Sequence, residues 1–285
     1  MPSPAPLTQV SAVPNPAHPF RKKVVMLYLL YFLVILFANT VGAVSGMGGG
    51  VIIKPALDAI GAHPLNVIGF FSSAAVFTMS IVSIIKQVRG GFQISWQRLF
   101  AIALGSIIGG RLGDTIFNIL MSLYNNPDKV QLIQIIITVI TLGLSIWYTY
   151  DPERKQLRLG GLFSFFLASL GLGILSTLLG IGGGPMNVAL FIALFGASTK
   201  QATVYSIITI FFSQLSKLTS IILAGSVAAE STSFLLVILP AAVIGGYVGS
   251  ALNQRMTNKA VNRTYLIITA SVILLNIVNG VLLFL

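Results

Sequence analysis

Two glycine clusters lie 134 residues apart in this chain, and each follows a long apolar run. The first is Gly46–Gly50, which reads GMGGG, and the second is Gly180–Gly184, which reads GIGGG. Because glycine is about 1 kcal/mol worse than alanine inside a helix, each cluster predicts a break in a helix. The matched positions indicate a duplicated unit, and a duplicated broken helix in a membrane protein is typical of a transport site.

The composition excludes an ordinary soluble domain. Hydrophobic residues make up 55% of the 285 and charged residues only 8%, whereas soluble domains carry roughly 25% charged residues. Apolar runs of about 20 residues, long enough to cross a bilayer as helices, recur along the chain. They occupy 24–45, 66–86, 97–119, 130–150, 159–179, 201–224, 232–252 and 262–285. Shorter apolar pieces at 51–60 and 185–195 follow the glycine clusters and rise only about 17 Å, which predicts re-entrant pieces or half-helices.

We therefore predict an all-α polytopic membrane protein with eight full spans and two short segments, eight to ten in total, arranged as two repeats. Further matches support the duplication: Ser72 matches Ser206 at the same offset, and Ile108–Gly113 matches Ile244–Gly249 at an offset of 136. The expected parts are a disordered tail at 1–23, a first repeat at 24–150, a linker at 151–158 and a second repeat at 159–285.

The orientation of the chain has two solutions. If the short pieces re-enter, the chain has eight spans. With a cytoplasmic N-terminus, nine loop lysines and arginines then lie on the cytoplasmic side and five on the outer side. If the short pieces cross, the two halves have opposite orientations, and the division is ten inside to four outside with the N-terminus outside. The positive-inside rule barely separates these solutions. Inverted halves would bring the two breaks face to face, whereas the basic segment Arg21–Lys23 favours a cytoplasmic N-terminus.

The glycine breaks are the first candidate for an anion site. A short helix that starts after Gly50 or Gly184 presents free backbone N–H groups and the positive end of its dipole. Glycine also lets a ligand approach the main chain closely, and Asn187 follows the second break closely enough to reach the same cavity. The alternative is that the glycines only allow tight helix packing. The predicted main-chain ligands are Gly48, Gly49, Gly50, Gly182, Gly183 and Gly184.

Ionisable side chains inside apolar segments are the second candidate. Each costs roughly 2.5–3.5 kcal/mol at a helix centre on insertion scales, so such residues usually have a function. We expect Lys54 and Lys217 to bind the anion, with snorkelling to the interface as the alternative. Asp58 lies four positions after Lys54 and is placed to pair with it, and Arg111 and Asp114 are placed to pair with each other. Asp58, Arg111 and Asp114 are also candidates for coupling or gating.

Small polar residues in the segments after the breaks are the third candidate. Positions 206, 209, 213 and 217 share one helical face, so the stripe ends in a lysine. Such a stripe is typical of a path for an oxygen-rich anion, and interhelical hydrogen bonding is the alternative. The candidates of this kind are Ser72, Ser73, Ser206, Thr209 and Gln214.

Other glycines carry a simpler prediction. Those in Gly105–Gly113 and Gly245–Gly249 are spaced by four, which favours close helix–helix contact.

The clusters also resemble the repeated signature of the TauE/SafE sulfite exporter family. The motif is Gly46-x-Gly48-Gly49-Gly50 followed by Pro55-Ala56-Leu57, with its partner Gly180-x-Gly182-Gly183-Gly184. The resemblance covers nearly the whole chain, from about residue 24 to 285. It implies transport of small anions, mainly sulfur-containing ones such as sulfite or organosulfonates, across a bacterial plasma membrane. The second copy departs from the first in having Ala189 where the first has Pro55, and Lys54 is assigned from its charge alone.

Together these features predict a multi-pass secondary transporter in the bacterial plasma membrane, not an enzyme. We expect the oxyanion to bind at the midplane between the two breaks, with an anion channel or a carboxylate transporter as alternatives. No cofactor, metal site or nucleic-acid partner is expected, since the chain has no cysteine and only two distant histidines. The expected partners are the small anionic substrate, membrane lipid and, as an option, a second copy of the chain.

Overall fold

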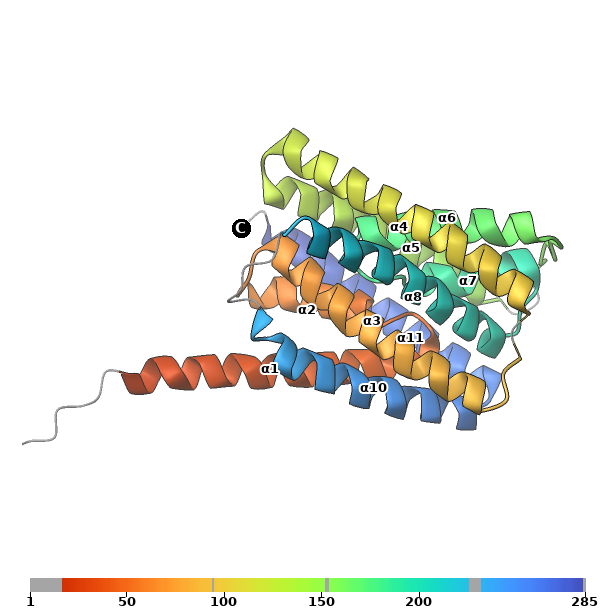
Figure 1. Ribbon diagram of the computed structural model, residues 1–285, viewed down its shortest axis with the longest axis horizontal. Coiled ribbons are helices and arrows are strands. Elements are labelled where there is room, and N and C mark those ends of the chain that lie inside the picture. The colour runs from red at the N-terminus through yellow and green to blue at the C-terminus, as the bar shows by residue number, and fades with distance from the viewer. Residues whose placement is uncertain (1–16, 94, 152–153, 226–231, 284–285) are drawn as a thin grey trace, which may run out of the picture.

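The computed structural model describes residues 17–93, 95–151, 154–225 and 232–283, and in these ranges it contains helices and no strand. This confirms the predicted all-helical class. Figure 1 shows the helices as one elongated bundle. They are α1 (Ala17–Ser45), α2 (Gly50–Ile60), α3 (Leu65–Arg89), α4 (Trp96–Tyr124), α5 (Pro127–Thr149), α6 (Leu162–Leu178), α7 (Pro185–Phe195), α8 (Thr199–Leu223), α10 (Leu235–Arg255) and α11 (Asn258–Leu282).

The helices follow the predicted apolar segments closely. Among the described residues, seven helices are long and apolar enough to cross a membrane, while α6 and α7 are shorter apolar helices. With 17 residues, α6 falls short of the full span expected at 159–179. The first helix begins at Ala17, inside the segment predicted as a tail, and the rest of that predicted tail, residues 1–16, lies outside the described residues.

Each glycine break turns the chain back along the helix that precedes it. In the first half, Gly49 lies against Asn39 of α1, and His63, just after α2, accepts or donates a 2.7 Å hydrogen bond with the Tyr31 hydroxyl. The start of α2 thus lies beside the later part of α1, and the residue after its end lies beside an earlier part, so α2 runs antiparallel to α1. In the second half, Phe165 of α6 stacks on Phe195 at the end of α7, with ring centroids 3.8 Å apart. Both short helices are therefore the return arms of hairpins.

The two halves contact each other through equivalent helices. Helix α1 packs on α10 as α6 packs on α4, and α3 packs on α10 as α8 packs on α4. At the centre, α3 and α8 pack on each other. They run antiparallel, because Gly69 near the start of α3 faces Lys217 near the end of α8, and Phe77 stacks on Phe211 at 5.2 Å.

The glycines spaced by four lie at the outer contacts between the halves. A Cβ on Gly109 would collide with the α6 backbone at Leu170, and one on Gly249 would collide with the α1 backbone at Thr40. The predicted close helix–helix contact is thus confirmed, and any larger residue at these positions would push the helices apart.

Candidate functional site

The two glycine breaks touch each other in the middle of the bundle. A Cβ on Gly48 would lie 3.2 Å from the Gly182 carbonyl oxygen, and one on Gly50 would overlap the Ile181 carbonyl. Six of the ten cluster residues have a positive φ, reaching +138° at Gly184. Only glycine adopts such angles without strain, so both the backbone path and the close contact require it.

Val76 on α3 and Ile210 on α8 fill the space beside the two breaks. These residues are also 134 positions apart, and both are fully buried. The Val76 side chain borders Gly182, and the Ile210 side chain borders Gly48 and Gly183. We call this contact the apolar seam. In this conformation the predicted glycine ligands therefore line a closed seam.

Several predicted polar residues surround the seam with unused hydrogen-bonding capacity. Ser72 and Ser73 are fully buried, and neither hydroxyl has a hydrogen-bond partner among the described residues. The Ser72 hydroxyl faces Gly50 at the start of α2. Asn187 Nδ2 lies beside Gly183 and also has no partner there.

The polar stripe on α8 is instead occupied by structural hydrogen bonds. Ser206 donates to the Gly46 carbonyl of the first break, and Thr209 donates to a carbonyl of its own helix. Gln214 Nε2 donates to the Ser176 hydroxyl at 2.9 Å. Of this stripe, Lys217 is the residue that reaches a cavity.

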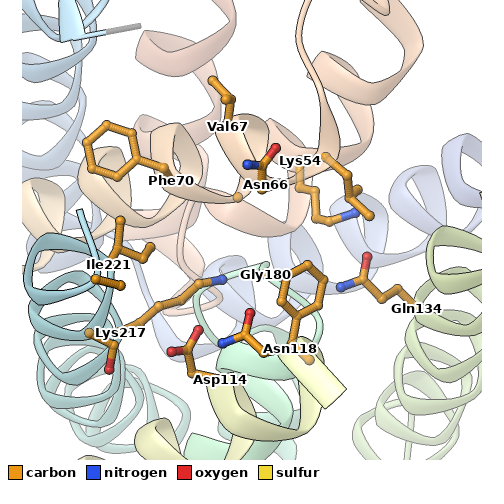
Figure 2. A pocket seen from close by; sticks show the side chains of 15 residues that line it. Lys54, Asn66, Val67, Phe70, Asp114, Asn118, Gln134, Gly180, Lys217 and Ile221 are labelled. Carbon is orange, nitrogen blue, oxygen red and sulfur yellow. The ribbon is translucent and has the colours of Figure 1, made fainter. Parts of the chain in front are cut away.

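That cavity, of about 100 Å³, lies beside Gly180 at the second break (Figure 2). Lys54 from α2 and Lys217 from α8 converge there: a Cβ on Gly180 would lie 3.4 Å from Lys54 Cε and 3.7 Å from Lys217 Nζ. Both lysines are only 5% exposed, and Asp114 of α4, which is 7% exposed, supplies the third charge. The neutral polar side chains of the lining are Asn66, Asn118, Gln134 and Ser220.

The two lysines differ in their counter-ions. Lys54 Nζ lies 2.9 Å from Asp58 Oδ2, which confirms the predicted pair. Lys217 Nζ donates to the Thr177 carbonyl at 3.3 Å, and no carboxylate of the described residues lies within ion-pair distance of it. A buried cation without a paired anion is costly, so this end of the cavity favours a bound negative charge.

The predicted pair of Arg111 with Asp114 is wrong. The Arg111 guanidinium reaches across to α8 and donates to the Ser220 hydroxyl. Asp114 turns into the cavity instead, and it also lines a wider outer hollow of about 550 Å³ that Arg111 borders. The long arginine side chain reaches a neighbouring helix, whereas the short aspartate does not, so their spacing on one helix did not decide the pairing.

Sequence reasoning missed the amides of the cavity. Asn66, Asn118 and Gln134 line it, and Gln134 Nε2 donates to the Leu178 carbonyl at 2.7 Å. Amides within apolar spans were the available signal, since they need partners there. Gly180 was recognised as part of a cluster but not as the residue on which the lysines converge.

At the other end of the bundle, the residues equivalent to two of the cavity-lining residues are joined by a hydrogen bond. Gln87 is the counterpart of Ile221 at an offset of 134, and Asn253 is the counterpart of Phe117 at an offset of 136. Gln87 Nε2 donates to Asn253 Oδ1 at 3.1 Å, and Asn253 Nδ2 donates to the Val44 carbonyl at the end of α1. We call this chain of hydrogen bonds the polar latch. At these equivalent positions the two ends differ, because one holds the cavity and the polar latch closes the other. A separate hollow of about 390 Å³, lined by Arg98, Gln201 and Tyr205, lies beside the starts of α4 and α8 at the latch end.

Comparisons with known proteins add a family and two relatives. A family model described as "Sulfite exporter TauE/SafE" matches residues 31–276. "Probable membrane transporter protein YunE" of Bacillus subtilis is 26% identical over 262 residues, which cover 83% of this chain and 92% of that protein. A "Probable membrane transporter protein" of Haemophilus influenzae is 26% identical over 178 residues, which cover 59% of this chain and 62% of that protein. No solved structure gives a significant match.

Proposed function

Because the chain belongs to the TauE/SafE sulfite exporter family of multi-pass membrane transporters, we propose that it moves a small oxyanion, such as a sulfonate or sulfite, across the bacterial plasma membrane. The observation that carries this proposal is Lys217, a buried ammonium group that faces a cavity and has no ion-paired carboxylate among the described residues.

The cavity suits a small anion with an oxygen-rich head. Its volume of about 100 Å³ holds several waters, each of which needs about 10–15 Å³, and the anion would replace them. The head group would accept charge-assisted hydrogen bonds from Lys54 and Lys217, while Phe70 and Phe117 in the lining would contact a short organic tail. In this binding mode Gly180 lets both ammonium groups approach the same point.

The difference between the two ends supports a transporter over a channel. A channel needs a path through the membrane, whereas here the apolar seam and the polar latch lie beyond the cavity. We propose that the antiparallel halves act as inverted repeats that exchange conformations. In the alternate state the latch would open, and the anion would pass between the glycine breaks at the midplane.

The loop charges suggest which end faces the cytoplasm. Each short helix carries the chain back to the end where the preceding helix began, so the loops are distributed as in the second solution of the sequence analysis, with ten loop cations toward the latch end and four toward the cavity end. The positive-inside rule then favours a cytoplasmic latch end, so the cavity would open away from the cytoplasm in this conformation.

Thermal unfolding and transport measurements test the proposal together. Purified protein is unfolded with methanesulfonate, sulfite or acetate, and counterflow of each labelled anion is measured in proteoliposomes. We expect saturable counterflow and stabilisation by at least one sulfur oxyanion, because a specific ligand stabilises the folded state. Stabilisation by acetate alone would favour the carboxylate alternative, and no counterflow of any of the three would contradict the proposal.

A further inference from the structure

Asp114 is the single carboxylate among the side chains that line the described cavity. It is 7% exposed, and no described cation lies within ion-pair distance of it. It lines both the cavity and the outer hollow, so it lies where the anion site meets the route to bulk water. Figure 2 shows its carboxylate on the same side of the cavity as Lys217 and Asn118.

The charges around the cavity nearly cancel when Asp114 is ionised. Helix α2 contributes Lys54 together with its partner Asp58, and α8 contributes Lys217. On α4, Arg111 donates to Ser220 and borders the outer hollow, but it does not line the cavity itself. The side chains that α3 and α5 contribute, Asn66 and Gln134 among them, carry no charge. The two lysines therefore face two carboxylates, and protonation of Asp114 leaves one net positive charge.

Resting on the transport function proposed above, we propose that Asp114 takes up a proton as the anion binds and releases it as the anion leaves. The added proton converts the carboxylate to a carboxylic acid, which removes the repulsion of the anion. Anion and proton thus favour each other's binding and cross the membrane in the same direction, one proton with each monoanion. The direction of net movement then follows the two gradients.

The rest of the chain explains why this role falls to Asp114. Asp58 is held by Lys54 at 2.9 Å, so its negative charge is already compensated. The counterpart of Asp114 at an offset of 136 is Ser250, which is buried and cannot carry a proton in this way. The second half therefore offers no equivalent carboxylate, and one proton accompanies each cycle.

Transport of methanesulfonate in proteoliposomes tests the proposal, since this strong acid stays ionised and any effect of pH reports on the protein. For the native protein, an outside pH one unit below the inside pH would support about tenfold accumulation of methanesulfonate inside the vesicles. Because the pair carries no net charge, membrane potential alone would drive none. We expect Asp114→Asn to lose the pH-driven accumulation, and measurable counterflow by the same variant shows that it is folded and still exchanges the anion. Asp128→Asn, which removes an exposed carboxylate at the start of α5, is the matched control and should behave as native.

A second measurement does not depend on transport. Infrared difference spectra of the purified protein with and without methanesulfonate at one pH should contain a protonated-carboxyl band that is lost in Asp114→Asn and remains in Asp128→Asn. The proposal is overturned if Asp114→Asn keeps this band or keeps the pH-driven accumulation. Failure of the native protein to exchange any tested anion would instead contradict the transport function, and the infrared band would still decide whether Asp114 binds the proton.

Discussion

Replacing Lys217 by methionine separates binding of the anion from folding of the protein. Methionine keeps a long unbranched side chain and a good helix propensity but removes the charge. Lys217 is 5% exposed and has no ion-paired carboxylate among the described residues, so removing its buried charge offsets the lost attraction to Asp114, and the ligand-free variant should be about as stable as the native protein. Anion binding should weaken strongly, because the buried head group loses one of its two cations.

The size of the effect follows from burial of this contact. Removing one partner of a buried, hydrogen-bonded charge pair costs about 2–5 kcal/mol, which corresponds to about 30-fold to about 4,000-fold in Kd. At an anion concentration of about 100 times the native Kd, the native protein gains about 2.7 kcal/mol of stability. A variant whose Kd is about 100-fold higher gains only about 0.4 kcal/mol at the same concentration.

The assay is thermal unfolding of the purified protein with and without the anion that stabilises the native chain. Lys129→Met, which removes an exposed lysine near the start of α5, is the matched control and should keep the native stabilisation. Equal stabilisation of Lys217→Met and native protein would refute the assignment of Lys217. Equal loss in both variants would show that net charge, and not the cavity, attracts the anion.

Three further changes have defined outcomes. The chain has no cysteine, so Gln87→Cys with Asn253→Cys places two thiols at the latch that a short bis-methanethiosulfonate reagent can bridge; the bridge should stop transport, and its reduction should restore transport. Gly180→Val should abolish anion binding, because φ is +67° there and both lysines lie close, whereas Gly143→Val, with open space around it, should bind normally in the same assay. Burial lowers the pKa of His63 in the folded protein, so the free energy of unfolding should decrease as the pH drops below about 6.5, the ordinary histidine value. In unfolding measurements, this decrease should be smaller for His63→Gln.

The features that the sequence predicted correctly depend on local properties of the chain. Glycine clusters break helices wherever they occur, and the length of an apolar run decides whether it spans a membrane. The Lys54–Asp58 pair was also predictable, because residues four apart on one helix are neighbours.

The features that were missed depend on how the two halves pack. Arg111 bonds to Ser220, which is 109 positions away in the sequence, and not to the nearer Asp114. Val76 and Ile210 carry no polar signal, yet they close the space between the breaks. The position of the cavity beside Gly180 depends on α2 and α8 approaching the second break from different halves, and no local pattern encodes that approach.

The central claim is that the anion binds in the cavity between Lys54 and Lys217. Crystals of the protein soaked with 2-bromoethanesulfonate test it most directly, because anomalous scattering from bromine locates the ligand. We expect the strongest bromine peak in the cavity, with the sulfonate beside Gly180 and the peak absent from crystals of Lys217→Met. A peak confined to exposed arginines at the latch end, with the cavity empty in native crystals, would contradict the claim.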